Sequence, residues 1–255
     1  MKKTNGYAIF DLDYTILPYD TMFLFANYIL KKERWRMFYL ILIFPLLPLA
    51  LLGLISTKTM KEFFLSFLWG ISKEKLETYS KEFVENEVLP KVSPEILKEI
   101  QLHAKEKVLI LNTAAPDFYV KFIGKYLEFD MVISTHVEFS KKWGFPKIIG
   151  KNNKSTVKVE NLLSKISDHS IKILSKDSKN PLFSNQLKNS ISFSDSYSDL
   201  PLLKITEKAK LINPDDLRLL QEAKKNDWEI LQYATPFRNK WQKYYISLLQ
   251  VFGLF

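Results

Sequence analysis

The segment Tyr7-Ala-Ile-Phe-Asp-Leu-Asp-Tyr-Thr15 decides the fold of this 255-residue chain. Its first four residues are apolar and predict a short strand buried on both faces, as in a parallel sheet. Asp11 and Asp13 follow this strand directly. Two carboxylates two positions apart at a strand end can face one pocket, where the Thr15 hydroxyl and backbone amides can hold phosphate oxygens. The segment therefore favours phosphoryl-transfer chemistry.

Later apolar runs repeat the strand pattern, and helical patterns lie between them. The strands are expected at 108–111, 131–134 and 191–194, and the helices at 93–105 and 116–126. Strands that alternate with helices predict an α/β fold with a doubly wound, Rossmann-like parallel sheet. Ligands of such sheets bind beyond the carboxyl ends of the strands, so polar residues there are the candidates for a functional site.

Three further groups of polar residues lie at such positions. Thr113 follows the second strand and precedes a helix start, which provides hydrogen-bond donors for a phosphate oxygen. Lys158 begins a helical pattern and can neutralise the charge that builds on a phosphoryl group and its nucleophile. Asp195 and Asp199 follow the fourth strand, where carboxylate oxygens suit Mg²⁺. The order of these groups along one chain is a stronger signal than any one of them.

With the groups in this order, the chain resembles the haloacid dehalogenase (HAD) superfamily, in the branch of phosphoserine phosphatases with a helical cap after the first motif. The segment 150–159 resembles the lysine motif of that branch in its spacing, which favours Lys158 over the alternative Lys154. Tyr14 and Ser194 replace glycines of the usual motifs. Neither position supplies a reacting atom, so activity is still expected.

The resemblance implies a Mg²⁺-dependent phosphatase with an aspartyl-phosphate intermediate. Asp11 would attack phosphorus, and Asp13 would protonate the leaving oxygen and then activate water. Mg²⁺ would lie between the Asp11 side chain, the backbone carbonyl of Asp13 and Asp195, while Asp199 would order the Lys158 ammonium. The remaining candidates are Thr113 in catalysis, with Thr15, Asn112 and Ala114 in substrate binding.

Nearly a hundred residues separate the first two strands, far more than one crossover helix needs. The apolar residues between 57 and 88 recur at helical spacing, which predicts a helical cap. The resulting division is a HAD core at 1–17 and 93–236, a cap at 18–92 and a basic, aromatic tail at 237–255. The polar stretch 164–190 is expected to be an exposed loop or insertion.

Composition narrows the possible partners. The chain has 37 basic and 28 acidic residues, a net charge of +9, which favours a polyanionic partner such as a phosphorylated substrate or an anionic membrane. Its basic residues are dispersed and nearly all lysine, which argues against nucleic acid. The absence of cysteine and the scattered histidines argue against a zinc enzyme. No secretory signal is visible, so a cytoplasmic start is expected. The oligomeric state stays open.

The stretch Met37–Thr57 contains 21 residues without a charge, a length typical of a membrane span. A single crossing would place Asp11 and Thr113 on opposite sides of the bilayer, so the stretch must return to the same face or stay inside the cap. Pro45 and Pro48 suit a bent element that dips into one leaflet. With the basic and aromatic tail, this predicts monotopic or peripheral attachment to the cytoplasmic face of the membrane. The alternative is a soluble protein with an apolar cap core.

A cap at the membrane would select a lipid phosphate such as phosphatidylglycerophosphate. The segments 44–52 and 67–70 are similar to lipid phosphatases of the phosphatidylglycerophosphatase C type. One alternative is a soluble phosphatase for phosphoserine-like metabolites, which usually needs a cap arginine for the substrate carboxylate; only Arg34 and Arg36 are near enough in sequence. The other alternative is a membrane adaptor that binds phosphate without catalysis.

Overall fold

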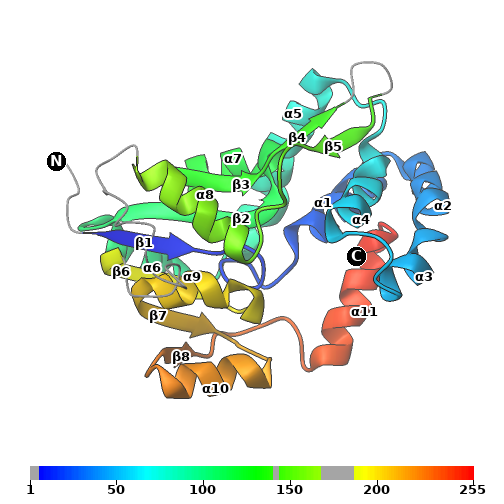
Figure 1. The fold of residues 1–255 in the computed structure, drawn as a ribbon. Helices are drawn as coiled ribbons and strands as arrows, with labels where there is room; N and C mark the ends of the chain where they lie inside the picture. The colour runs from blue at the N-terminus through cyan, green and yellow to red at the C-terminus, as the bar shows by residue number, and fades with distance from the viewer. Residues whose placement is uncertain (1–5, 140–143, 168–186) are drawn as a thin grey trace.

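A computed structural model describes residues 6–139, 144–167 and 187–255. Its centre is a six-stranded parallel sheet in the order β3-β2-β1-β6-β7-β8, with β1 in the interior (Figure 1). The predicted α/β, Rossmann-like fold is therefore confirmed. The strands are β1 Tyr7–Phe10, β2 Val108–Pro116, β3 Met131–Thr135, β6 Leu187–Ser194, β7 Thr206–Ile212 and β8 Glu229–Leu231.

Helices cover both faces of the sheet because the side chains of β1 alternate between two apolar cores. Ala8 and Phe10 pack in the core that includes residues of α6 and α7, whereas Ile9 packs with residues of α8 and α9. All three side chains are fully buried, which explains the continuous apolar run. The covering helices are α6 Pro94–Ala104, α7 Asp117–Tyr126, α8 Thr156–Ser167, α9 Leu200–Ile205 and α10 Leu217–Lys225.

The pairing register of the strands determines where the functional residues lie along the sheet. Phe10 pairs with Leu111 on one side and with Phe193 on the other. The backbone amide of Asp11 then donates to the Phe193 carbonyl at 3.0 Å. The residues that follow these three strands consequently meet at one edge of the sheet.

Strand β2 is longer than the expected 108–111 and ends only at Pro116. Its pairing with β3 shifts register between Asn112 and Pro116, so Thr113 lies in an irregular strand end. Helix α7 begins at Asp117 after Pro116, which makes no side-chain cap. Thr113 is thus not a helix N-cap. A separate antiparallel pair, β4 Val137–Phe139 with β5 Pro146–Ile148, follows β3.

Most of the stretch 164–190, expected to be an exposed loop, lies outside the described residues. At its ends, residues 164–167 belong to α8 and residues 187–190 to β6. Strand β7 was not predicted because it has no clear apolar run. Its sequence, TEKAKLI, contains a glutamate and two lysines and only three aliphatic residues.

Short helices occupy the region between β1 and α6. The first of them begins at Thr21 because Asp20 is its N-cap: the Asp20 carboxylate accepts hydrogen bonds from the backbone amides of Met22 and Phe23. Ser56 and Ser72 cap two later helices in the same way. The helices are α1 Thr21–Lys32, η1 Arg34–Tyr39, α2 Leu40–Ile43, α3 Leu46–Leu51, α4 Thr57–Phe64, η2 Leu65–Leu68, α5 Lys73–Phe83, η3 Val84–Val88 and η4 Leu89–Lys91.

The apolar stretch Met37–Thr57 folds into short helices with a turn at Pro45. Within the described residues, no helix is long and apolar enough to span a bilayer. Tyr39 and Ile43 are buried in the main core, whereas Phe38 and Ile41 are exposed. One face of the stretch therefore packs in this core and the other faces solvent.

The segment 237–255 contains helix α11, Lys240–Val251, which Asn239 caps. Helix α11 packs against α1, close to the short cap helices and away from the sheet (Figure 1). Its outer side is aromatic and exposed; Trp241 is 83% accessible.

Candidate active site

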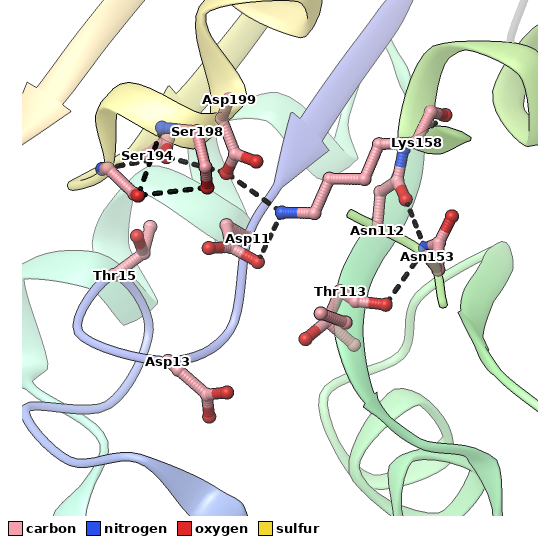
Figure 2. Close-up of polar contacts among 12 residues, drawn as sticks. Asp11, Asp13, Thr15, Asn112, Thr113, Asn153, Lys158, Ser194, Ser198 and Asp199 are labelled. Carbon is pink, nitrogen blue, oxygen red and sulfur yellow. Dashed lines mark hydrogen bonds and ion pairs between the residues drawn. The ribbon is translucent and has the colours of Figure 1, made fainter. Parts of the chain in front are cut away.

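A buried lysine connects two strand ends at the carboxyl edge of the sheet. The Nζ of Lys158, in the first turn of α8, lies 2.7 Å from Asp11 Oδ1 and 2.8 Å from Asp199 Oδ2 (Figure 2). The lysine side chain is only 2% exposed. Burial alone lowers the pKa of Lys158, but the two carboxylates more than offset it and raise that pKa. Lys158 is therefore a permanent cation in this site.

Ser194, which replaces a motif glycine, holds Asp199 in place. Its hydroxyl donates to Asp199 Oδ2 at 2.8 Å and accepts from the Ser196 amide at 3.2 Å. The second oxygen, Asp199 Oδ1, is buried without a hydrogen-bond partner among the described residues. Buried acceptors are normally hydrogen-bonded, so a bound molecule or water would supply the donor here.

Asp195 lies near Asp11, and Lys243 offsets its charge only in part. Burial and the Asp11 carboxylate raise the pKa of Asp195 to about 8. Burial also raises the pKa of Asp11, to about 7, although Lys158 opposes this shift. The Thr15 hydroxyl donates to Asp195 Oδ1 at 3.4 Å, so it supports a carboxylate. Asp11 and Asp195 form an anionic pair that a cation would stabilise.

The carboxylate of Asp13 faces the start of helix α1. Its Oδ1 accepts from the Thr21 amide at 2.8 Å and from the Thr21 hydroxyl at 2.7 Å. That hydroxyl also lies 3.1 Å from the Tyr119 hydroxyl. Burial, followed by the nearby Asp20 and Asp11 carboxylates, raises the pKa of Asp13 well above its ordinary value. Asp13 is thus held in place and favours its protonated form.

A buried asparagine, Asn153, organises the end of β2. Its side-chain amide donates to Asn112 Oδ1 at 2.9 Å and to the Thr113 carbonyl at 2.8 Å. Asn112 in turn donates to the Lys158 carbonyl at 3.2 Å. The amide of Asn112 is therefore engaged with the protein on both sides, in contrast to its expected contact with substrate. It positions the backbone that carries Lys158 (Figure 2).

One pocket of about 760 Å³ lies over these residues, a size suited to a small organic ligand. Of the predicted site residues, Thr15 and Asn112 do not line it. Lys154 lines it too, but its side chain is exposed and is not part of the buried bridge. The predicted residues that do line it are Asp11, Asp13, Thr113, Ala114, Lys158, Asp195 and Asp199.

The cap contributes a cation that the sequence did not reveal. Lys61 of α4 lines the pocket and donates to the Ala114 carbonyl at 2.7 Å and to Asn152 Oδ1 at 3.0 Å. Burial lowers its pKa. Lys61 lies three residues before the buried Phe64, and because residues at this spacing share a helix face, the spacing was the signal that could have indicated it. The sequence patterns also did not indicate Thr21 as a site residue, although its place directly after the capping Asp20 marks it as the first residue of the helix.

The described residues contain no group of three or more His, Cys, Asp or Glu side chains arranged to hold a metal. The predicted Mg²⁺ set differs from such a group because it combines two carboxylates, of Asp11 and Asp195, with the backbone carbonyl of Asp13. All of these donors are oxygens, which is the ligand type that Mg²⁺ prefers.

Comparisons with known proteins find similar chains. The chain is 23% identical over 241 residues to a protein named histidinol-phosphatase from Neisseria meningitidis serogroup C (strain 8013), covering 89% of this chain and 98% of that protein. A solved structure of a protein of unknown function from Bordetella pertussis Tohama I is similar with a TM-score of 0.71, 22% identity and coverage of 89% of this chain and 99% of that one.

A probable phosphoserine phosphatase from Vibrio cholerae shares the fold with a TM-score of 0.61 and 14% identity, over 97% of this chain and 65% of that one. At these identities the structural matches establish the fold alone. The model of the haloacid dehalogenase-like hydrolase family matches residues 8–204, which include Asp11, Lys158 and Asp199. The chain therefore belongs to the haloacid dehalogenase-like hydrolase family.

Proposed function

We propose that this protein is a Mg²⁺-dependent phosphomonoester hydrolase that forms a covalent phosphoryl intermediate on Asp11. The observation that carries the proposal is the buried bridge of Lys158 between Asp11 and Asp199 in the lining of the pocket. Lys158 favours the ionised, nucleophilic form of Asp11 against the effect of burial. It also supplies a fixed positive charge where negative charge builds during phosphoryl transfer.

In the first half-reaction, an Asp11 oxygen bonds to phosphorus while the bond from phosphorus to the leaving oxygen breaks. Asp13 gives its proton to that oxygen. In the second, Asp13 takes a proton from water, whose oxygen attacks phosphorus and releases inorganic phosphate and the Asp11 carboxylate. The raised pKa of Asp13 suits the donor role, because the group carries a proton before the first step. Its two hydrogen bonds from Thr21 hold it in one orientation.

Thr113 and Ala114 are the proposed phosphate contacts, since both line the pocket beside Asp11. Thr113 Oγ1 accepts from the Ala115 amide at 3.1 Å, so its own proton is available for a phosphate oxygen. Thr15 and Asn112 support the site through Asp195 and Lys158. Lys158 is preferred over Lys154 as the catalytic lysine because it alone joins the buried bridge.

The residues present fit Mg²⁺. Burial and repulsion by neighbouring carboxylates raise the pKa values of the Asp11 and Asp195 carboxylates to about 7 and about 8, the response expected of anionic oxygens that nearby cations only partly neutralise. With the Asp13 carbonyl these two carboxylates would hold the ion, and the unpartnered Asp199 Oδ1 could accept from its hydration shell. When bound, Mg²⁺ offsets the repulsion between an anionic nucleophile and an anionic substrate.

For the substrate, the comparisons support a small soluble phosphomonoester. A relative named histidinol-phosphatase covers most of the chain, and several structures with the same fold are phosphoserine phosphatases. Arg36 is not available for a substrate carboxylate, because its guanidinium donates to Glu33 and to the Phe67 and Trp69 carbonyls. Lys61 is the cap cation in the pocket and the proposed contact for a second polar group of the substrate.

A lipid phosphate at the membrane surface is the second candidate, and the shape of the cap favours it. Leu40 and Ile43 line the pocket, whereas Phe38 and Ile41 of the same stretch are exposed. Phe44 does both, because it is 76% exposed and also lines the pocket. An apolar surface that continues into a pocket is suited to a ligand drawn from a bilayer.

The function is tested by phosphate release from the purified protein with Mg²⁺. The panel contains histidinol phosphate, phosphoserine and phosphatidylglycerophosphate in mixed micelles, with the Asp11→Asn variant as control. Activity on any ester that the variant lacks supports the phosphatase, and the ratio of kcat/KM values selects the substrate class. Binding of all three esters without phosphate release would instead favour a non-catalytic phosphate-binding protein.

A further inference from the structure

The C-terminal helix is part of the wall of the active-site pocket. Leu248 and Val251 of α11, with Phe252 just after it, line the same pocket as Asp11 and Lys158. These residues come from the far end of the chain, more than 50 positions after Asp195. Helix α11 packs against α1, and in Figure 1 it lies apart from the sheet. The pocket therefore has three sources: the sheet edge, the cap and the C-terminus.

Specific polar contacts hold the end of the chain to the cap. Asn27 of α1 is buried, and its side chain pairs with both backbone groups of Phe255: Nδ2 donates to the carbonyl and Oδ1 accepts from the amide, each at 3.0 Å. The Tyr39 hydroxyl donates to the Val251 carbonyl at 3.0 Å. A Cβ on Gly253 would lie 2.7 Å from the Leu30 Cβ, so only glycine permits this approach. Such contacts define one docked position of α11.

A second attachment joins α11 to the nucleophile loop. Tyr14 lies between Asp13 and Thr15 with a φ of 57°, a left-handed conformation that costs a side chain about 1–2 kcal/mol relative to glycine. The ammonium of Lys243, on α11, lies 3.6 Å from the centre of the Tyr14 ring. A cation at this distance from an aromatic face is attracted to it. A tyrosine at a position suited to glycine is explained by this contact.

We propose that the C-terminal helix belongs to the active site: Leu248, Val251 and Phe252 contact an apolar leaving group, and Tyr14 is a positioning residue that couples the helix to the nucleophile loop. The inference rests on the proposed phosphatase function and deepens it. Contacts to the leaving group lie remote from phosphorus, and their binding energy raises kcat/KM. The helix thus selects esters with an apolar alcohol.

The chain contains no cysteine, so one introduced thiol reports on one position. The test uses Leu248→Cys in the full chain with Asp11→Asn, which prevents turnover, and follows the rate of maleimide labelling. We expect 1-naphthyl phosphate at saturation to slow labelling at least fivefold and inorganic phosphate to leave it unchanged. The matched control is Leu217→Cys, an exposed leucine of α10 that does not line the pocket, where neither ligand should have an effect.

Turnover measurements separate positioning from simple stability. Glycine at position 14 removes the backbone strain and the ring together, so Tyr14→Gly should not lower Tm through the loop, yet should lower kcat/KM for 1-naphthyl phosphate about tenfold. Tyr14→Phe keeps the ring and should recover most of this loss. A role confined to loop conformation predicts the reverse, with Tyr14→Gly at least as active as Tyr14→Phe.

The two proposals fail in different ways. A wild-type protein that hydrolyses neither 1-naphthyl phosphate nor any other phosphomonoester would refute the phosphatase. A wild type that hydrolyses 1-naphthyl phosphate, together with Leu248→Cys labelling that this ester leaves unchanged, would overturn the role of the C-terminal helix alone.

Discussion

Lys158 Nζ lies 2.7 Å from Asp11 Oδ1, and the two residues are 147 positions apart in the chain. The pairing requires the first turn of helix α8 to lie next to the end of strand β1 at the sheet edge. It places a buried cation against the proposed nucleophile, and Asp199 completes the bridge from a third element. Removal of the cation would leave two carboxylates buried and unpaired.

Lys158→Met is therefore expected to reduce stability and turnover together. Loss of one partner from a buried ion pair costs about 3–5 kcal/mol of unfolding free energy. Loss of a preorganised charge lowers kcat by about 10²–10³. Urea unfolding and steady-state kinetics measure the two effects. Lys154→Met is the matched control, since that side chain is exposed; a larger loss of turnover in this control would move the catalytic role to Lys154.

Mg²⁺ binding is expected to release protons and to strengthen as the pH rises from about 6 to 8. The reason is that the pKa values of Asp11 and Asp195 are about 7 and about 8 in the metal-free protein, so the ion must displace protons at lower pH. Calorimetry in two buffers of different ionisation enthalpy measures the protons released. Asp195→Asn should bind Mg²⁺ weakly and with a smaller proton release. Affinity independent of pH would argue against this ligand set.

Glu33 is expected to stabilise the cap above pH 4. Burial alone raises its pKa, but hydrogen bonds from Lys75, Tyr79 and Arg36 prevail and lower it to about 2. Since the folded pKa lies below the unfolded value of about 4.3, the stabilisation is present above pH 4.3 and is lost as the pH falls toward 2.

Glu33→Gln should accordingly lower stability at pH 7 by about 1–3 kcal/mol and should match the wild type near pH 2. Thermal unfolding followed by circular dichroism at several pH values measures the difference. Glu87→Gln is the comparison, because the ion pair of Glu87 with Lys91 is partly exposed and contributes little. Equal losses of unfolding free energy for the two variants at pH 7 would show that the Glu33 contacts stabilise the protein no more than a partly exposed ion pair does.

The membrane hypothesis predicts co-sedimentation with anionic phospholipid vesicles that weakens with salt. Exposed Phe38 and Ile41 would insert, and the exposed Arg34 and Lys240 would add the salt-sensitive part. Phe38→Ser with Ile41→Ser should reduce binding about tenfold or more, since each removes an apolar contact worth about 1.5–3 kcal/mol when buried. Leu217→Ser is the control, an equally exposed leucine on α10. If the wild type does not bind the vesicles, the membrane hypothesis is rejected and the soluble substrate class is favoured.

The sequence predicted the residues whose position follows from strand order. Asp11, Asp195 and Asp199 follow buried strands, and parallel strands bring their carboxyl ends to one edge. Asn112 and Thr15 lie at the same strand ends, yet their side chains are engaged by Asn153, Lys158 and Asp195. Periodicity reports which residues lie near an edge, whereas hydrogen-bond partners depend on distant segments that no local pattern reveals.

Contributions from distant segments were hidden for the same reason. The apolar end of the chain resembled an interfacial helix, and its exposed side keeps that character. Leu248 lies on that exposed side and also lines the pocket, which only the docked position of α11 reveals. Tyr14 looked like a neutral replacement of glycine because its partner, Lys243, lies 229 residues further along the chain.

The most direct test of the account is to locate the phosphoryl group during turnover. Wild-type protein mixed with Mg²⁺ and its best substrate is quenched in acid within milliseconds, digested and analysed by mass spectrometry. We predict one phosphoryl group on the peptide that contains Asp11, removable by hydroxylamine as expected of an acyl phosphate, and absent from Asp11→Asn. Undiminished turnover by Asp11→Asn, or a phosphoryl group on another residue, would contradict the central claim.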